Sequence, residues 1–342
     1  MTNWVLEYVW IDAVGGLRSK NRIVEQDENQ NVLISEWSFD GSSTGQAEGT
    51  ESDVLLKPCA IFKNPFITFT KSLIVLCDCY NKDGTPHVTN HRVGCVKTYE
   101  KCNGEEPLFG IEQEYILFGR NNLPYEWKEH GEPGCGRQGP YYCGVGGDRC
   151  FGRKISEKHL ELCLDAGIKI CGTNAEVMAS QWEYQIGPLN PLEVSDHLWV
   201  SRYILMRVTE DYDCYVSFHP KPYKGDWNGS GGHTNFSTKS MRTSTDNRTG
   251  LDAIEEACKK LEIRHKEHML CYGEHNEERL SGKHETSSID NFSWGIGDRG
   301  RSIRIPLPVF IKKEGYLEDR RPASNLDPYL VTEKIINSVI LN

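Results

Sequence analysis

The chain has 342 residues, of which 38% are hydrophobic and 26% are charged, a balance typical of a folded globular protein and unlike that of a disordered or membrane-embedded one. Its length exceeds the usual size of one domain, about 100 to 200 residues, so two domains are expected. The formal net charge of -10 argues against nucleic acids and anionic membranes as partners, but not against small anions, because arginines cluster locally.

The chain shows no pattern of secretion or membrane insertion. No apolar run approaches the roughly 18 residues that a spanning helix needs. The first residues, Met-Thr-Asn-Trp, lack the basic and apolar regions of a signal peptide. The 13 cysteines are odd in number and irregularly spaced, which favours free thiols over a disulfide framework. The sequence therefore predicts a cytoplasmic protein.

Two segments near the N-terminus, residues 4–11 and 72–80, are rich in β-branched and aromatic residues and predict strands. The long stretch between them is dense in Gly, Ser and Asp without clear periodicity, and we interpret it as irregular but ordered, because Trp37 and Phe39 suit burial. A polar segment at residues 101–107 marks a boundary. The prediction is a small β-rich domain over residues 1–103 and a second domain over residues 104–342.

Strands and helices alternate from Phe109 onward. Strands are expected over residues 109–118, 168–178, 181–187 and 302–305. Apolar spacing predicts helices over residues 152–166, closed by Gly167, and 195–211, with Ser195 as the N-cap. Further helices are expected over residues 250–268 and from Asp327-Pro onward, since proline is tolerated in a first helical turn.

Glu112 and Glu114 lie two positions apart within the apolar strand 109–118. Side chains alternate across a strand, so both carboxylates leave one face, while Ile111, Gln113 and Tyr115 leave the other. Burying two ionised carboxylates together costs several kcal/mol unless a cation lies between them, which points to a divalent metal site. The alternative, from this stretch alone, is a chance acidic pair on a solvated face.

Four more candidate ligands lie on or next to predicted strands. The complete set is Glu112, Glu114, Glu176, Glu183, His233 and Glu318. Five acids and one imidazole carry too much charge for one Mg2+. Two ions, each keeping some water, fit the set better, because Mg2+ and Mn2+ prefer oxygen ligands and Mn2+ tolerates a histidine.

Arginines cluster in the C-terminal third of the chain. They are Arg299, Arg301, Arg304, Arg320 and Arg321. Clustered arginines beside carboxylate-held ions are typical of a phosphoryl-transfer site, where positioning and charge neutralisation do most of the catalysis. The alternative is a surface ion-pair network with nearby acids. No P-loop or dinucleotide-binding glycine motif is present, so a nucleotide would bind by another route.

Two glycine-containing loops complete the candidate site. The loop that begins at Asn228 leads into a strand on which His233, Asn235 and Ser237 face one way, so its backbone can approach a ligand closely. The polar segment 281–287 can act as a lid.

These residues closely resemble glutamine synthetases of the eukaryotic type, class II. Ten motifs carry the resemblance in chain order, from residue 5 to about residue 335, and ten in order do not arise by chance. The motifs are Phe39-Asp-Gly-Ser-Ser-Thr, Ser52-Asp, Phe109-Gly-Ile-Glu-Gln-Glu-Tyr, Gly139-Pro-Tyr-Tyr-Cys-Gly-Val-Gly, Asn174-Ala-Glu-Val-Met, Gln181-Trp-Glu-Tyr-Gln-Ile-Gly-Pro, Asn228-Gly-Ser-Gly-Gly-His-Thr-Asn, His284-Glu-Thr-Ser, Ser302-Ile-Arg-Ile-Pro and Glu318-Asp-Arg-Arg-Pro.

The resemblance implies an α+β fold with a β-grasp N-terminal domain and a catalytic domain whose curved antiparallel sheet is flanked by helices, as in guanidino kinases. It also implies the ATP-dependent joining of L-glutamate and ammonia through a γ-glutamyl phosphate, releasing ADP and phosphate. The family pattern would assign Glu114, Glu176 and Glu183 to a first metal. It would assign Glu112, His233 and Glu318 to a second metal that bridges the ATP phosphates.

The resemblance also implies roles for residues around the metals. The implied catalytic residues are Asp53, Glu285, Arg299, Arg304 and Arg320. The implied ammonium pocket is Asp53, Tyr142, Glu183 and Glu285. The implied glutamate contacts are Glu114, Trp227, Asn228, Gly229, Arg299 and Arg320. The implied ATP contacts are Glu112, Glu183, Gln185, Gly187, Pro188, Asn235, Phe236, Ser237, Arg299, Arg304, Tyr316 and Glu318.

In this family the residue matching Asp53 reaches the site of a neighbouring subunit, so the resemblance implies stacked pentameric rings, a decamer. Two other interpretations stay open. A catalytically dead relative should have lost ligands, whereas all six remain here. A γ-glutamylpolyamine synthetase or a guanidino kinase shares the fold, but the retained ammonium-pocket residues argue against both.

Overall fold

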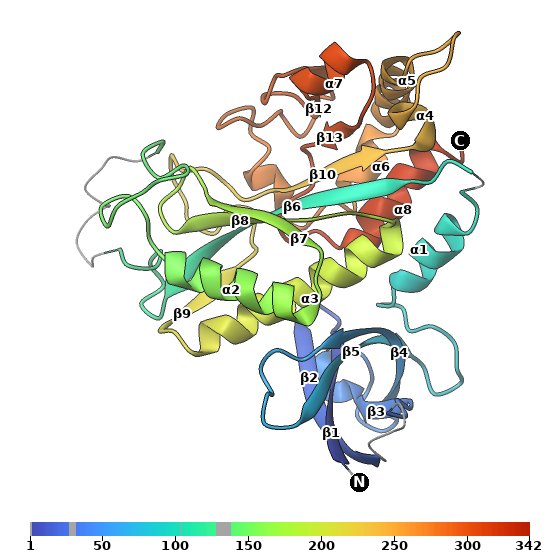
Figure 1. Ribbon diagram of the computed structural model, residues 1–342, viewed down its shortest axis with the longest axis vertical. Coiled ribbons are helices and arrows are strands. Elements are labelled where there is room, and N and C mark those ends of the chain that lie inside the picture. Colours follow the sequence, from blue (N-terminus) through green and yellow to red (C-terminus); the bar gives the residue numbers. More distant parts are fainter. Residues whose placement is uncertain (1, 27–31, 103, 128–137) are drawn as a thin grey trace.

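The computed structural model describes residues 2–26, 32–102, 104–127 and 138–342, and these form two β-sheets with helices around them (Figure 1). The N-terminal sheet has the order β2-β1-β5-β4-β3. Its strands are β1 (Thr2–Ile11), β2 (Leu17–Gln26), β3 (Trp37–Asp40), β4 (Asp53–Lys63) and β5 (Lys71–Tyr80). The central strand β1 is buried from Val5 to Trp10 and pairs antiparallel with β2 and parallel with β5.

The strands expected at residues 4–11 and 72–80 are confirmed, but the expectation of an irregular stretch between them is wrong. That stretch contains β2, β3 and β4. The edge strand β2 is polar and largely accessible to solvent, so its sequence lacks the apolar alternation of a half-buried strand. A β-bulge between Pro58 and Ala60 interrupts the register of β4. Tertiary pairing, not residue preference, makes these segments strands.

The second sheet has the order β11-β12-β13-β10-β6-β8-β7, with β9 paired to the far end of β6. Its neighbours pair antiparallel except β11 and β12, which are parallel. The strands are β6 (Leu108–Gly119), β7 (Ile170–Ala175), β8 (Gln181–Leu189), β9 (Cys214–Ser217), β10 (Gly232–Ser237), β11 (Trp294–Ile296), β12 (Ile303–Ile305) and β13 (Leu317–Asp319). The strand that carries Glu112 and Glu114, β6, therefore lies near the middle of this sheet.

The helices are α1 (Arg92–Tyr99), α2 (Arg153–Ala166), α3 (Pro191–Glu210), α4 (Lys239–Arg242), α5 (Gly250–Ile263), α6 (His265–Met269), α7 (Leu307–Lys312) and α8 (Pro328–Val339). Of these, α2 and α3 lie between the second sheet and the N-terminal sheet, whereas α5 and α7 lie at the end of the molecule away from the N-terminal sheet (Figure 1). The guanidinium of Arg202 on α3 donates to Oε1 of Gln113 at 2.6 and 2.8 Å. Helix α3 thus packs on the face of β6 opposite to Glu112 and Glu114.

The predicted helix boundaries meet different outcomes. Helix α2 ends before Gly167, as expected, and Gly167 adopts a left-handed conformation with φ 81°. Helix α8 begins after Asp327, also as expected, and the Asp327 carboxylate accepts the N–H of Tyr329 at 2.9 Å. The prediction of Ser195 as a cap is wrong, because the side chain of Asn190 caps α3 and Pro191 occupies its first turn. The single helix expected over residues 250–268 is two helices, α5 and α6, separated at Arg264.

The two sheets share one hydrophobic core. Val9, Phe62 and Ile74 of the N-terminal sheet belong to the same buried cluster as Tyr115 and Tyr184 of the second sheet. Helix α1 precedes the expected boundary at residue 103, yet it packs on α3 and α8, for example through Cys95 Sγ and Thr332 Oγ1 at 3.5 Å. The division at residues 103 and 104 stays a prediction.

None of the described helices combines the length and the apolar character that crossing a membrane requires. The cysteines in the described ranges are free thiols, and Cys77 and Cys79 are buried. A cytoplasmic location stays a prediction.

Candidate functional site

The alternation of β6 places Glu112 and Glu114 on the wall of a cavity of about 690 Å3. The side chain of Gln113 turns the other way, toward α3. The prediction that the two carboxylates leave the same face is thus confirmed. Strands β8 and β10 flank β6 and supply further cavity residues, since Glu114 lies opposite Glu183 and Glu112 lies opposite His233 in the strand register.

One group of acids lies on the β7 side of this cavity. One oxygen each of Glu114, Glu176 and Glu183 lie within 4.8 Å of one another. Burial raises the pKa of all three carboxyls, and neighbouring carboxylates raise the pKa of Glu176 and Glu183 further. Their hydrogen-bond donors include neutral groups, such as the N–H of Gly231 to Glu114 at 2.7 Å and the Asn174 amide to Glu176 at 3.0 Å.

A second group lies on the β10 side and shares one acid with the first. The ligand atoms of Glu112, Glu183 and His233 also lie within 4.8 Å of one another. Nδ1 of His233 is 3.4 Å from Oε2 of Glu112 and 3.8 Å from Oε1 of Glu318. Burial lowers the pKa of His233 well below its usual value, so the ring is neutral. The structure therefore brings all six predicted ligands together.

The donor set fits divalent cations of the Mg2+ or Mn2+ type. Carboxylate oxygens are the preferred ligands of Mg2+, and one imidazole is compatible with Mn2+. Without a cation, buried carboxylates facing one another are costly, which their raised pKa values express. Two groups joined through Glu183 have room for two neighbouring ions.

Three of the five clustered arginines line the cavity, namely Arg299, Arg304 and Arg320. Arg304 and Arg320 both pair with Glu318, the latter at 2.6 Å. The other two lie elsewhere. Arg321 is fully buried in an ion pair with Asp319 at 2.7 Å, and Arg301 pairs with Asp298 at 2.7 Å. Of these two, only Arg301 forms a surface ion pair of the kind considered from the sequence, because the pair of Arg321 with Asp319 is fully buried.

Sequence analysis missed a fourth cavity arginine, Arg279. It is 5% exposed, and its Nη2 donates to Nε2 of His233 at 3.1 Å and to the carbonyl of Arg320 at 2.8 Å. It lies in a loop without periodicity. The available signal was that Arg279 is the lone arginine between residues 271 and 298, just before the predicted lid.

The predicted lid segment lies over the cavity. His284 and Glu285, both in the left-handed region with φ 54° and 60°, line it. His284 Nε2 pairs with Asp226 at 3.0 Å, which ties the lid to the loop carrying Asn228 and Gly229. The latter two also line the cavity, as does Tyr142. Trp227 is buried and packs against Trp127 instead, so it supports the loop from behind.

An apolar pocket of about 400 Å3 adjoins the acid-lined cavity and shares Glu112 and Gln185 with it. The remaining predicted nucleotide contacts on its wall are Gly187, Pro188, Asn235, Phe236, Ser237 and Tyr316. Gly187 has φ 112°, and a Cβ there would lie 2.5 Å from the carbonyl oxygen of Phe109. Only glycine therefore suits this close approach of β8 to β6.

Asp53 does not reach the cavity of its own chain. It is an exposed residue at the start of β4, in the N-terminal sheet, and it is absent from the cavity wall. Its implied role depends on a second copy of the chain.

The fold and site define an enzyme class before any comparison: a sheet-based site with paired carboxylate groups, opposing arginines and an adjoining apolar pocket suits phosphoryl transfer from a nucleotide. Family models agree. The model "Glutamine synthetase, beta-Grasp domain" matches residues 4–82, and "Glutamine synthetase, catalytic domain" matches residues 94–254.

Individual proteins give the same result. Proteins named glutamine synthetase from Agaricus bisporus and Amanita muscaria are 52% and 53% identical over 336 residues, covering 98% of this chain and 93% of theirs. A cryo-EM structure of Plasmodium falciparum glutamine synthetase has a similar fold, with a TM-score of 0.76 at 19% identity, covering 98% of this chain and 71% of that one. The chain belongs to the glutamine synthetase family.

Proposed function

We propose that the acid-lined cavity and its adjoining pocket join L-glutamate to ammonia at the expense of ATP in this chain, forming L-glutamine through γ-glutamyl phosphate and releasing ADP and phosphate. The observation that carries this proposal is the pair of ligand groups sharing Glu183, faced by the cavity arginines. Such a site neutralises both transferred phosphate and substrate carboxylate, which this reaction requires.

The six ligand residues would hold two cations, each of them Mg2+ or Mn2+. Glu114, Glu176 and Glu183 would hold one, and Glu112, His233 and Glu318 the other. When bound, the cations supply neutralisation of phosphate charge and removal of repulsion among the acids. His233 faces the carboxylates through Nδ1, and a cation would bind this nitrogen only when the ring proton has left it.

ATP would lie with its base and ribose in the apolar pocket and its phosphates toward the acid-lined cavity. Glu112 and Gln185 line both the apolar pocket and the acid-lined cavity. A molecule that fills the pocket would therefore extend toward the metal-ligand groups. Tyr316 and Phe236 supply apolar surface there, and Asn235 and Ser237 supply polar groups.

The glutamate side chain must be phosphorylated first, because a carboxylate is a poor electrophile. Arg299, Arg304 and Arg320 line the cavity and would hold the two anions together during this transfer. Nε of Arg304 is buried and meets no hydrogen-bond partner in the described part of the chain, so it retains a donor for an anion. Asn228, Gly229 and Glu114 would position the glutamate backbone, with Trp227 packed behind the loop.

Ammonium must lose a proton before its nitrogen attacks the acyl phosphate. Tyr142, Glu183 and Glu285 line one cavity and would attract the cation. Glu285 also lies on the lid segment, which would exclude water that hydrolyses an acyl phosphate. Asp53 would act as the base from a neighbouring subunit, since it is exposed and lies away from its own cavity. This role requires self-association, for which we propose stacked pentameric rings.

The test is phosphate release from ATP by the purified protein with Mg2+ and glutamate, in the presence of ammonium, of a polyamine, or of neither. We expect release that depends on ammonium and is lost in Glu114→Ala and Asp53→Ala. The matched control is Glu262→Gln, an exposed acid on α5. Polyamine dependence would instead assign the chain to a sister activity, and no release from an intact oligomer would contradict the proposal.

A further inference from the structure

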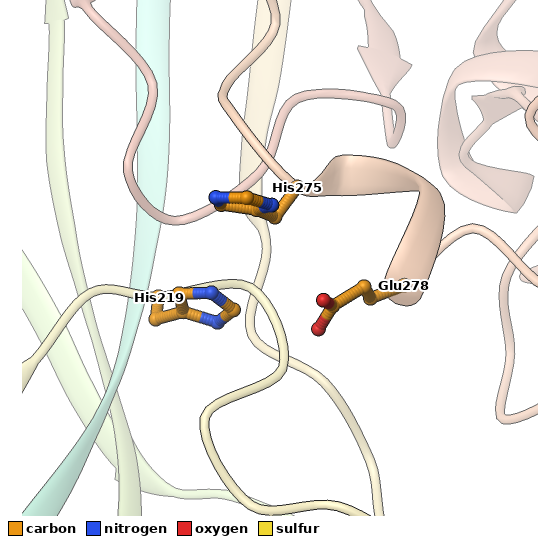
Figure 2. A group of neighbouring side chains, drawn as sticks. All are labelled: His219, His275 and Glu278. Atoms are coloured by element: carbon orange, nitrogen blue, oxygen red, sulfur yellow. The ribbon is translucent and has the colours of Figure 1, made fainter.

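Outside the acid-lined cavity, His219, His275 and Glu278 form a separate cluster. His219 lies two residues after β9, and the other two lie at the short 3-10 turn Asn276–Glu278. One ligand atom from each lies within 4.8 Å of the others. Figure 2 shows the two imidazole rings stacked, with the Glu278 carboxylate turned toward them. None of the three lines the acid-lined cavity.

The chemistry of this cluster differs from that of the acid-lined cavity. Two imidazoles with one carboxylate suit Zn2+ and related transition-metal ions, whereas Mg2+ prefers an all-oxygen set. Burial lowers the pKa of His219, which favours the neutral ring that a metal requires. The side chain of His275 is 57% exposed and that of Glu278 31% exposed, so an ion can enter from solvent.

Two interactions must give way when an ion binds. The ammonium of Lys224 pairs with Glu278. Nδ1 of His219 accepts the backbone N–H of Lys221 at 3.0 Å, so a metal bond to this ring must compete with that hydrogen bond. Lys224 is 69% exposed and belongs to a long, rotatable side chain, so it can leave Glu278 at small cost. The ammonium of Lys224 therefore competes with the ion for the Glu278 carboxylate.

The cluster joins two segments that form walls of the acid-lined cavity. His219 opens the loop that continues to Asn228 and Gly229, and the carbonyl of Pro220 accepts the N–H of Ser230 at 2.8 Å. Glu278 directly precedes Arg279, the cavity arginine that contacts His233. An ion held by the cluster would therefore tie one wall to the other.

We propose that His219, His275 and Glu278 form a second metal site, selective for Zn2+-type ions, that clamps these two walls from outside the cavity. The site goes beyond the proposed function and does not depend on it. Zn2+ bound here restrains the loop and the Arg279 segment without entering the catalytic ligand groups.

The test uses the purified full-length protein in excess Mg2+, and measures Zn2+ binding by equilibrium dialysis and by calorimetry. We expect the unmodified protein to bind one more Zn2+ per subunit than His275→Ala, or to bind that ion at least about tenfold more tightly. Glu278→Gln should behave like His275→Ala. Equal number and affinity of Zn2+ ions in the unmodified protein and both variants would overturn the proposal.

Two further variants separate a defined site from general attraction of cations. Lys224→Gln removes the competing ammonium and should tighten Zn2+ binding, although a surface that merely attracts ions would also gain from the lost positive charge. Glu274→Gln distinguishes these cases, because it removes an exposed acid one residue from His275. We expect Glu274→Gln to bind Zn2+ like the unmodified protein. Weakening equal to that of Glu278→Gln would contradict a defined site.

A thermal measurement gives an independent readout. Zn2+ should raise the unfolding midpoint of the Mg2+-saturated protein, since the ion joins two segments only in the folded state. This increase should be absent in His275→Ala, whose midpoint without Zn2+ should match that of the unmodified protein. An equal increase in both proteins would contradict the proposal that Zn2+ at this cluster joins the two segments.

Discussion

Buried glutamates occur in two regions of this molecule, and their surroundings differ. Glu7 of β1 is 3% exposed, accepts hydrogen bonds from Asn64 at 2.7 Å and from Tyr203, and pairs with Arg207 at 3.0 Å. Glu183 of β8 is 7% exposed, but it faces Glu112 and the other cavity acids, and it accepts a hydrogen bond from the neutral amide of Gln185.

The difference separates a structural acid from a functional one. The chain supplies Glu7 with a positively charged partner, Arg207, and with hydrogen-bond donors. This carboxylate therefore joins α3 to the N-terminal sheet without a bound metal ion. The acids around Glu183 repel one another and need cations that the chain alone provides only in part, through arginines on Glu318. Burial by itself therefore does not mark a site; burial among like charges does.

The largest expected effect is that of Glu183→Gln, which removes the acid shared by both ligand groups. Ammonium-dependent glutamine formation should fall by about a thousandfold or more, about 4 kcal/mol of transition-state stabilisation. Because this change also removes repulsion, the metal-free variant should unfold at the same temperature as the unmodified protein or higher. Activity within tenfold of normal, measured beside the Glu262→Gln control, would show that the shared acid is dispensable.

Glu7→Ala tests the other side of the comparison. It leaves Arg207 and Tyr203 without their buried partner, and we expect a loss of about 3 kcal/mol in the free energy of unfolding, measured from urea midpoints. Saturating Mg2+ should not reverse this loss, since the acid lies outside the ligand groups. Full recovery with Mg2+ would mean that Glu7 acts through the metal site.

Removal of Mg2+ from protein that carries no Zn2+ should destabilise the protein through the cavity acids alone. At Mg2+ concentrations about a hundredfold above the dissociation constant, binding stabilises the folded state by about 2 to 3 kcal/mol. Thermal unfolding with and without chelator measures this difference, which Glu183→Gln should reduce and Glu7→Ala should leave unchanged. A chelator effect of the same size in all three proteins would place the responsible cation elsewhere.

The sequence was most informative where a local pattern coincided with burial. Strand β6 combines apolar residues with Glu112 and Glu114 at a spacing of two, so strand geometry alone predicts their common face. The start of α8 was predictable for a similar reason, because Asp327 and the following proline form a local cap. Residue spacing within one element carries this information.

Long-range pairing was not predictable in this way. The polar edge strand β2 exists because it pairs with β1, and Arg279 reaches His233 from a loop 46 residues away. The same limit hid the cluster of His219 and His275, which comes from two segments without any shared motif. It also hid the position of Arg321, because the sequence placed this residue in the C-terminal arginine cluster, whereas the fold buries it against Asp319 and away from the cavity.

The smallest expected effect concerns the ion pair of His91 with Asp327. The chain supplies both partners of this pair, as it does for Glu7. Its Nδ1 lies 2.7 Å from Asp327, and this hydrogen bond raises the pKa of the imidazole in the folded state. The stabilisation is therefore complete below the ordinary pKa of histidine and is lost as pH rises through the raised value. Since the ring is 37% exposed, solvent screening keeps the effect below about 1 kcal/mol. Urea midpoints measured from pH 5.5 to 8.5 should fall slightly more in the unmodified protein than in His91→Gln, and parallel curves would show that the pair contributes nothing.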